Sequence, residues 1–191
     1  MIVRRITAAS AGVALAATAF AAAPAMAKNT TTTLTLDSGL VGALTAAKVA
    51  PSAIKPAKLK GTSISFPATL KGSKVNHKGG LKLTLGSSYV TLQNISINTK
   101  NGKATAGVDN SLTKSVITIK NILVFKGGKN TIAKNGKWSN ATVSLAKSVN
   151  ITNPPLGKQD PAATLAQVLG LPAGSIPTGQ KLGTATISVK K

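Results

Sequence analysis

From Lys60 onward, apolar and polar residues alternate with a period of two along most of the chain. In "GGLKLTL", residues 79–85, the three leucines share one parity, and the lysine and one threonine take the other. Successive side chains of a strand point to opposite faces, so this period is typical of half-buried strands. The chain contains no cysteine, which means that packing and not disulfide bonds must hold the strands together. The alternation therefore predicts a mainly β protein.

Two local signals refine the predicted strands. In "YVTLQNISIN", Val90 and Leu92 share one parity, whereas Ile95 and Ile97 take the opposite one. A one-residue slip of this kind predicts a β-bulge near Gln93 and Asn94. The Asn-Gly pair within residues 100–103 favours a tight hairpin turn after this strand. The strand after that, residues 115–125, has the most continuous apolar run and is predicted to be the most buried.

Two segments have helical spacing. Residues 37–49 place apolar side chains on one face, with Asp37 or Ser38 as the N-cap. Pro51 and Pro56 then predict an irregular link over residues 50–58. A rigid loop over residues 153–161 precedes a short second helix with Asp160 near its start. The order of strands, helices and turns predicts an antiparallel β-sandwich with two short helices.

The N-terminus has the three parts of a secretory signal peptide. "MIVRR" is positively charged, an Ala-rich apolar run follows, and "AMA" before Lys28 fits a cleavage site. We therefore predict a cleaved signal peptide over residues 1–27 and a single domain over residues 28–191. The protein would be secreted and extracellular, in free or wall-associated form, with no transmembrane segment after cleavage.

The predicted mature chain is strongly basic. Both of the chain's arginines leave with the signal peptide, so 22 lysines face only three aspartates, a net charge of +19. This charge would attract anionic cell-envelope polymers, or it would simply keep a β-rich surface soluble and protect sheet edges. Specific nucleic-acid recognition is not expected, because the mature chain lacks the arginine fork and has few aromatic rings for base stacking.

The residues needed for most enzyme chemistry are scarce. The chain has one histidine, no glutamate and three scattered aspartates, and it shows no G-x-S-x-G nucleophile motif. It also has no closely spaced pair of metal ligands. We therefore predict a non-enzymatic protein with no catalytic residues and no metal site.

A resemblance to a known family rests on several segments of the sequence. These are "LTLD" at 34–37, "SFP" at 65–67, the His-x-Gly-Gly-Leu motif at 77–81 and the C-terminal segment 163–189. In this order the segments resemble the HtaA-type domain of exported actinobacterial proteins, over essentially the whole mature chain. The resemblance implies a β-rich domain at the cell surface whose best-known members bind haem.

The resemblance also implies roles for single residues. In the best-known members a tyrosine on the first helix is the iron ligand, and the motif histidine, here His77, supports it by hydrogen bonding. Residues 37–49 contain no tyrosine, and Val41 or Leu44 stands at that position. His77 and Tyr89, the chain's single tyrosine, are the candidate ligand-binding residues, beside the motif glycines Gly79 and Gly80.

Three interpretations of His77 remain open on the sequence alone. The residue could have a structural role at a strand entry, where Gly79 and Gly80 permit a close turn. It could belong to a haem site, in which lysines such as Lys78 and Lys82 neutralise the propionates. It could also be a base or a metal ligand in another kind of site.

The sequence thus predicts an exported binding module, with haem or a related porphyrin, free or on a haemoprotein, as the candidate ligand. The expected site is a cleft between the first helix and the strand that bears His77, with apolar walls and lysines at its rim. The alternative prediction is a basic structural or adhesive envelope protein held by wall polyanions.

Overall fold

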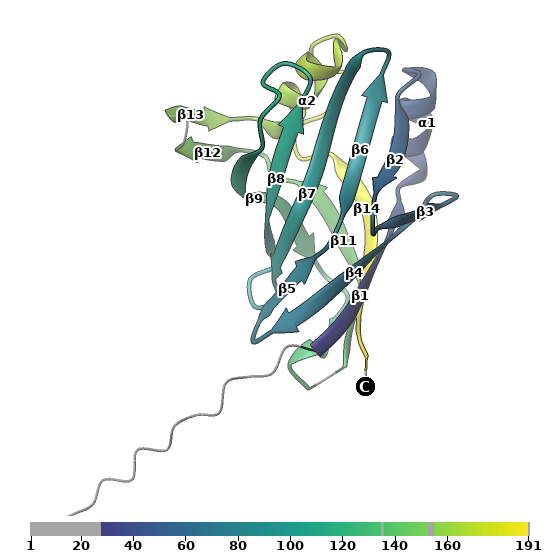
Figure 1. Cartoon of the computed structure of the whole chain (residues 1–191), viewed down its shortest axis with the longest axis vertical. Coiled ribbons are helices and arrows are strands. Elements are labelled where there is room, and N and C mark those ends of the chain that lie inside the picture. The colour runs from purple at the N-terminus through teal and green to yellow at the C-terminus, as the bar shows by residue number, and fades with distance from the viewer. Residues whose placement is uncertain (1–27, 135, 153–154, 191) are drawn as a thin grey trace, which may run out of the picture.

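The structure is a computed structural model that describes residues 28–134, 136–152 and 155–190 (Figure 1). The predicted signal peptide, residues 1–27, lies outside the described residues. In the described part of the chain, no helix has the length and apolar character that a membrane crossing requires.

Eight antiparallel strands form a closed barrel. Each strand pairs with two neighbours, in the order β7-β5-β4-β1-β14-β11-β9-β8, and the pairing of β7 with β8 closes the ring. Their bounds are β1 (Lys28–Leu36), β4 (Ser63–Lys71), β5 (Lys74–His77), β7 (Ser88–Asn98), β8 (Lys103–Asn110), β9 (Ile117–Lys126), β11 (Lys137–Leu145) and β14 (Lys181–Val189). The mainly β class is confirmed, but the predicted sandwich is wrong. Period-two patterning is the same in both architectures, because each buries one face of every strand.

At one end the barrel flares open. Strand β7 pairs with β5 over its C-terminal part but with β6 (Gly80–Leu85) over its N-terminal part, and β6 pairs in turn with β2 (Ala50–Ile54). The pair β2–β6 therefore leaves the barrel wall as a flap beside the helix α1 (Figure 1). A short strand, β3 (Lys58–Lys60), pairs with β4 below it.

Strand β2 corrects the irregular link predicted over residues 50–58. Pro51 lies opposite Leu83 in the β2–β6 pair, and β2 has no further neighbour on its other side among the described strands. A proline cannot donate a ladder hydrogen bond, but an edge strand tolerates it. Only the pairing with β6, more than 25 residues away along the chain, makes this segment a strand.

Two helices cover the flared end (Figure 1). Helix α1 (Ser38–Ala46) begins after Asp37, whose carboxylate accepts a hydrogen bond from the Gly39 amide at 3.1 Å. Helix α2 (Pro161–Leu169) begins after Asp160, whose carboxylate accepts from the Ala162 amide at 2.9 Å. These N-caps match the prediction, since an aspartate satisfies amides that have no partner inside the helix.

The chain between β11 and α2 forms a hairpin in place of most of the predicted loop. Strand β12 (Val149–Thr152) pairs with β13 (Pro155–Gln159) and projects from the barrel (Figure 1). The short strand β10 (Lys129–Asn130) and a 3₁₀ turn at Ile132–Lys134 complete the described elements.

Among the register shifts of the barrel, those in β7 and β9 affect which side chains point inward near the site. The predicted bulge in β7 is confirmed, because the β7–β8 register shifts between Gln93 and Ser96 and Asn94 has a φ of 52°. Strand β9 contains a second bulge at Asn121, with a φ of 58°. The prediction that this strand is the most buried is wrong, since Thr118, Lys120 and Asn121 are exposed.

Candidate functional site

His77 lies inside the barrel, at the last position of β5. Only 7 % of its surface is exposed, and the Phe66 ring meets the imidazole edge-on with the ring centroids 5.9 Å apart. The space beside it measures about 30 Å³ and has uncharged lining residues from seven of the barrel strands. This space is too small for an organic ligand, since ligand pockets usually measure about 300–1,000 Å³.

Both ring nitrogens of His77 have hydrogen-bond partners. Nδ1 lies 2.8 Å from the backbone oxygen of Ile95, and Nε2 lies 2.7 Å from Oγ1 of Thr32. A carbonyl oxygen only accepts, so Nδ1 carries the proton and donates to Ile95. Nε2 then accepts from the Thr32 hydroxyl, and its lone pair is not free to ligate a metal.

Burial lowers the pKa of His77 to about 4, and the hydrogen bond to Ile95 offsets part of this effect. An imidazolium would be costly in this apolar interior, because no charged group lines the space around the ring. The side chain is therefore neutral at pH 7. The geometry favours the structural interpretation among the three that the sequence leaves open.

The motif glycines allow the chain to pass close to its neighbours where β6 separates from β5. A Cβ atom on Gly79 would lie 2.3 Å from the backbone oxygen of Ile54, and Gly79 has a φ of 80°. A Cβ atom on Gly80 would lie 2.2 Å from the backbone oxygen of Leu92. Side chains larger than hydrogen at these two positions would clash with β2 and β7, so the glycine pair is needed where β6 leaves the barrel wall.

Tyr89 lies near the start of β7, opposite Thr84 of β6, and its recorded contacts do not include His77. Its hydroxyl donates to Oδ2 of Asp109 at 3.5 Å, and Lys82 Nζ lies 4.5 Å from the centre of its ring. The other carboxylate oxygen of Asp109 is buried and has no hydrogen-bond partner among the described residues. The structure therefore does not bring the two candidate ligand residues, His77 and Tyr89, into one site.

A larger cavity lies in the mouth of the barrel, where the flap leaves the wall. It measures about 460 Å³ and lies between α1, the middle of α2 and the segment 171–182. Strands β1, β6, β7, β11 and β14 also contribute lining residues. Most of its lining residues are leucines, and the polar ones are Asp37, Ser175 and Gln180. Asp37 also pairs with Lys181, whose Nζ lies 2.7 Å from Oδ2 and marks a charged rim.

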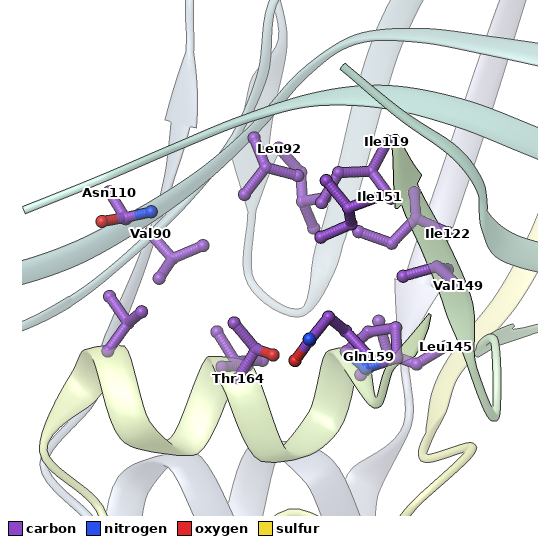
Figure 2. Close-up of a pocket in the computed structure, with 14 residues that line it drawn as sticks. Val90, Leu92, Asn110, Ile119, Ile122, Leu145, Val149, Ile151, Gln159 and Thr164 are labelled. Carbon is purple, nitrogen blue, oxygen red and sulfur yellow. The ribbon is translucent and has the colours of Figure 1, made fainter. Parts of the chain in front are cut away.

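A smaller cavity of about 60 Å³ lies on the other side of α2, under the β12–β13 hairpin. Figure 2 shows Val90 and Leu92 of β7 and Ile151 of β12 facing Thr164 of α2 across this space. Leu92, Leu145 and Leu165 line both cavities and form their shared wall. Together the two spaces make the flared end of the barrel an apolar interior.

The mouth cavity differs from the predicted cleft in one important respect. Helix α1 forms one wall as expected, but His77 does not line the cavity. Of the two residues considered for the helix ligand position, Leu44 lines the cavity and Val41 does not. The segment 171–182 was missed as part of the site. Its apolar residues Leu171, Ile176 and Leu182, within a stretch rich in proline and glycine, were the available signal.

The residues of the mouth cavity do not fit an iron ion. Protein ligands to haem iron are usually histidine, cysteine, methionine or tyrosine, and none of these lines the cavity among the described residues. The described part of the chain also holds no group of three or more His, Cys, Asp or Glu side chains that could bind a metal. The cavity therefore offers apolar surface without a metal ligand.

Comparisons with known proteins support the fold. No protein-family model matches the sequence, and no curated protein matches it. Among solved structures, the N-terminal domain of HtaA from Corynebacterium glutamicum is similar at a TM-score of 0.53 and 13% identity, covering 87% of this chain and 99% of that one.

Two further structures from Corynebacterium glutamicum are similar over comparable lengths. The C-terminal domain of HtaA has a TM-score of 0.48 at 13% identity, covering 85% of this chain and 96% of that one. The heme binding protein HtaB has a TM-score of 0.46 at 14% identity, covering 86% and 96%. The resemblance drawn from the sequence is thus confirmed at the level of the fold, which this chain shares with the N-terminal domain of HtaA.

Proposed function

We propose that this protein is a non-enzymatic binding module that holds an apolar ligand in the mouth cavity between α1 and α2. The observation that carries the proposal is a cavity of about 460 Å³ lined mainly by leucines. Clefts of this size with apolar walls and few polar groups are the usual form of small-molecule sites, and barrel mouths are a preferred place for them.

The apolar walls would provide most of the binding free energy. Burying apolar ligand surface contributes about 25 cal/mol per Å². Asp37, Ser175 and Gln180 would orient a polar end of the ligand, since they are the polar groups in the lining. Gln180 already donates its side-chain amide to the Lys181 backbone oxygen at 2.8 Å, which leaves its own side-chain oxygen to accept.

Haem or a related porphyrin is the candidate ligand that the HtaA-type resemblance suggests. The cavity suits the apolar ring of a porphyrin, but its lining provides no residue of the usual kinds to coordinate iron. We therefore expect the protein to hold a porphyrin through its ring and to be insensitive to the metal at its centre. His77 would keep a structural role, remote from the ligand.

The test is a pair of titrations of the purified protein, one with haem and one with metal-free protoporphyrin. Absorbance and fluorescence would give the two dissociation constants, which we expect to agree within about threefold, less than 1 kcal/mol. A tenfold preference for haem would show iron coordination and contradict this mode of binding. Failure of both porphyrins and of a fluorescent apolar probe to bind would overturn the proposed site.

We further propose that the protein acts outside the cell, secreted or associated with the wall. The support is the three-part N-terminus over residues 1–27, which has the charged, apolar and small-residue parts of a secretory signal peptide. N-terminal sequencing of protein recovered from culture medium should give Lys28 as the first residue. Recovery of chains that begin at Met1 would contradict cleavage.

A further inference from the structure

A second hollow lies outside the barrel. Its lining is basic and polar, whereas the mouth cavity is lined mostly by leucines. The second hollow measures about 480 Å³ and lies where β8 begins, beside β9 and the link from β11 to β12. Three lysines line it, Lys103 from β8, Lys120 from β9 and Lys147 from the link. We name this hollow the lysine groove.

Among the described residues, no acidic side chain balances the positive charge of the lysine groove. None of the chain's three aspartates lines it. Among the described residues the recorded salt bridge joins Lys181 to Asp37, and none joins a groove lysine to an aspartate. The three lysines are exposed, so their ammonium groups can reach a ligand. Three like charges around one hollow repel one another, and binding an anion relieves this repulsion.

The bulge in β9 exposes Lys120 and Asn121 at the hollow. Ala104 pairs with Leu123 and Ala106 pairs with Ile119, so Thr105 alone spans three residues of β9. The alternation breaks there, and Lys120 and Asn121 are exposed in succession. Bulges commonly re-aim side chains in this way next to functional sites.

The link that bears Lys147 is fastened beside the same bulge. The Ala146 amide donates to the Ile122 backbone oxygen at 2.8 Å. Ala146 directly precedes Lys147, and Ile122 directly follows the bulge residue Asn121. Asn121, Ser148 and Asn150 also line the groove and bring amide and hydroxyl donors. Charged and neutral donors therefore surround one volume that has no acidic group in its lining.

We propose that the lysine groove binds a chain of phosphate groups, as in polyphosphate or a phosphodiester polymer. Lysine recognises phosphate as a point charge and does not require the paired geometry that arginine supplies. The described groove residues include no aromatic ring on which a nucleic-acid base could stack. The assignment is independent of the mouth cavity and of what that cavity holds.

The test is a titration of the purified protein with sodium tripolyphosphate at low ionic strength, in which isothermal titration calorimetry measures the dissociation constant. The groove variant carries Lys103→Gln, Lys120→Gln and Lys147→Gln. The matched control carries Lys60→Gln, Lys71→Gln and Lys74→Gln, which removes the same charge from exposed positions on β3, β4 and β5. All six lysines are exposed, so both variants should keep the fold, as circular dichroism would verify.

We expect the groove variant to bind tripolyphosphate about tenfold more weakly, from three lost ion pairs, and the control to change less than twofold. Equal weakening in both variants would show a diffuse effect of net charge and overturn the proposal. So would an absence of binding by the unaltered protein.

Two further probes identify the source of the phosphate. A short glycerol-phosphate oligomer that binds more tightly than tripolyphosphate would identify a phosphodiester polymer, and the reverse order would identify polyphosphate. A single-stranded oligonucleotide of equal charge should bind more weakly than the better of these two. Tighter binding of the oligonucleotide, lost in the groove variant, would overturn the assignment in favour of nucleic acid.

Discussion

Nε2 of His77 lies 2.7 Å from Oγ1 of Thr32, so the hydroxyl of the first strand donates to the single histidine of the chain. The two residues are 45 positions apart and come from strands that both pair with β4. Together with the Ile95 contact, this bond satisfies every polar atom of the imidazole inside the barrel. His77 therefore links β5, β1 and β7 below the mouth cavity.

Replacing Thr32 by valine should destabilise the protein. The substitution keeps the shape but removes the hydroxyl, which leaves Nε2 buried without a partner, and such a loss costs about 1–3 kcal/mol. Thr33→Val is the matched control, because Thr33 is the exposed neighbour on the same strand and should change stability little. Urea denaturation measures both. A Thr32→Val protein as stable as the control would contradict the role of this hydrogen bond.

The stability of the protein should fall as the pH falls from 6.5 toward 4. The folded-state pKa of His77 is about 4 and its ordinary value is 6.5, so the unfolded chain binds the proton first. The stabilisation that neutral His77 contributes is thus fully present above pH 6.5. The free energy of unfolding then decreases by about 3 kcal/mol as the pH falls from 6.5 to 4.

Denaturation at several pH values measures this slope. Asp37 contributes only at lower pH, because its hydrogen bond with Lys181 holds the pKa of its carboxyl below the usual value. The variant His77→Gln should be less stable at pH 7 but should lose most of the slope between pH 6.5 and 4.5. An unchanged slope in His77→Gln would assign the effect to other groups.

Gly80→Ala should destabilise the protein by about 2 kcal/mol, because the new Cβ would meet the Leu92 backbone oxygen at 2.2 Å and force the strands apart. Gly42→Ala is the opposite case. Gly42 lies within α1 with nothing near its Cβ position, so alanine there should stabilise the helix by about 0.5–1 kcal/mol. Thermal melting measures the change in stability of each variant. A Gly80→Ala protein as stable as the unaltered chain would contradict the close approach of β6 and β7.

Ala43→Trp should block the mouth cavity. Ala43 lines the cavity from α1, so an indole there would occupy the volume assigned to the ligand. Ala46→Trp places the same side chain on the same helix, at an exposed position that does not line the cavity. Porphyrin or apolar-probe titration should show at least tenfold weaker binding for Ala43→Trp and little change for Ala46→Trp. Equal binding by both variants would exclude this cavity as the site.

The local elements were predictable because each depends on residues close together in the sequence. The inward leucines Leu81 and Leu83, the bulge at Asn94 and the N-caps Asp37 and Asp160 all follow from period, parity or a single side chain. The motif glycines Gly79 and Gly80 were also recognised, although the backbones that they approach could not be named.

The architecture and the site required distant pairings. The alternation of apolar and polar residues is the same in a sandwich and in a barrel. Only the hydrogen-bonded pairing of β7 with β8 and of β9 with β11, which closes the sheet, distinguishes the two folds. Ala50–Ile54 becomes a strand only because β6 lies beside it, despite Pro51. The sequence determined which face of each strand is apolar, whereas the tertiary structure decided that His77 and Thr32 meet inside the barrel. It also decided that α1 and the segment 171–182 enclose an apolar cavity above them, because contacts across dozens of residues depend on how the sheet closes.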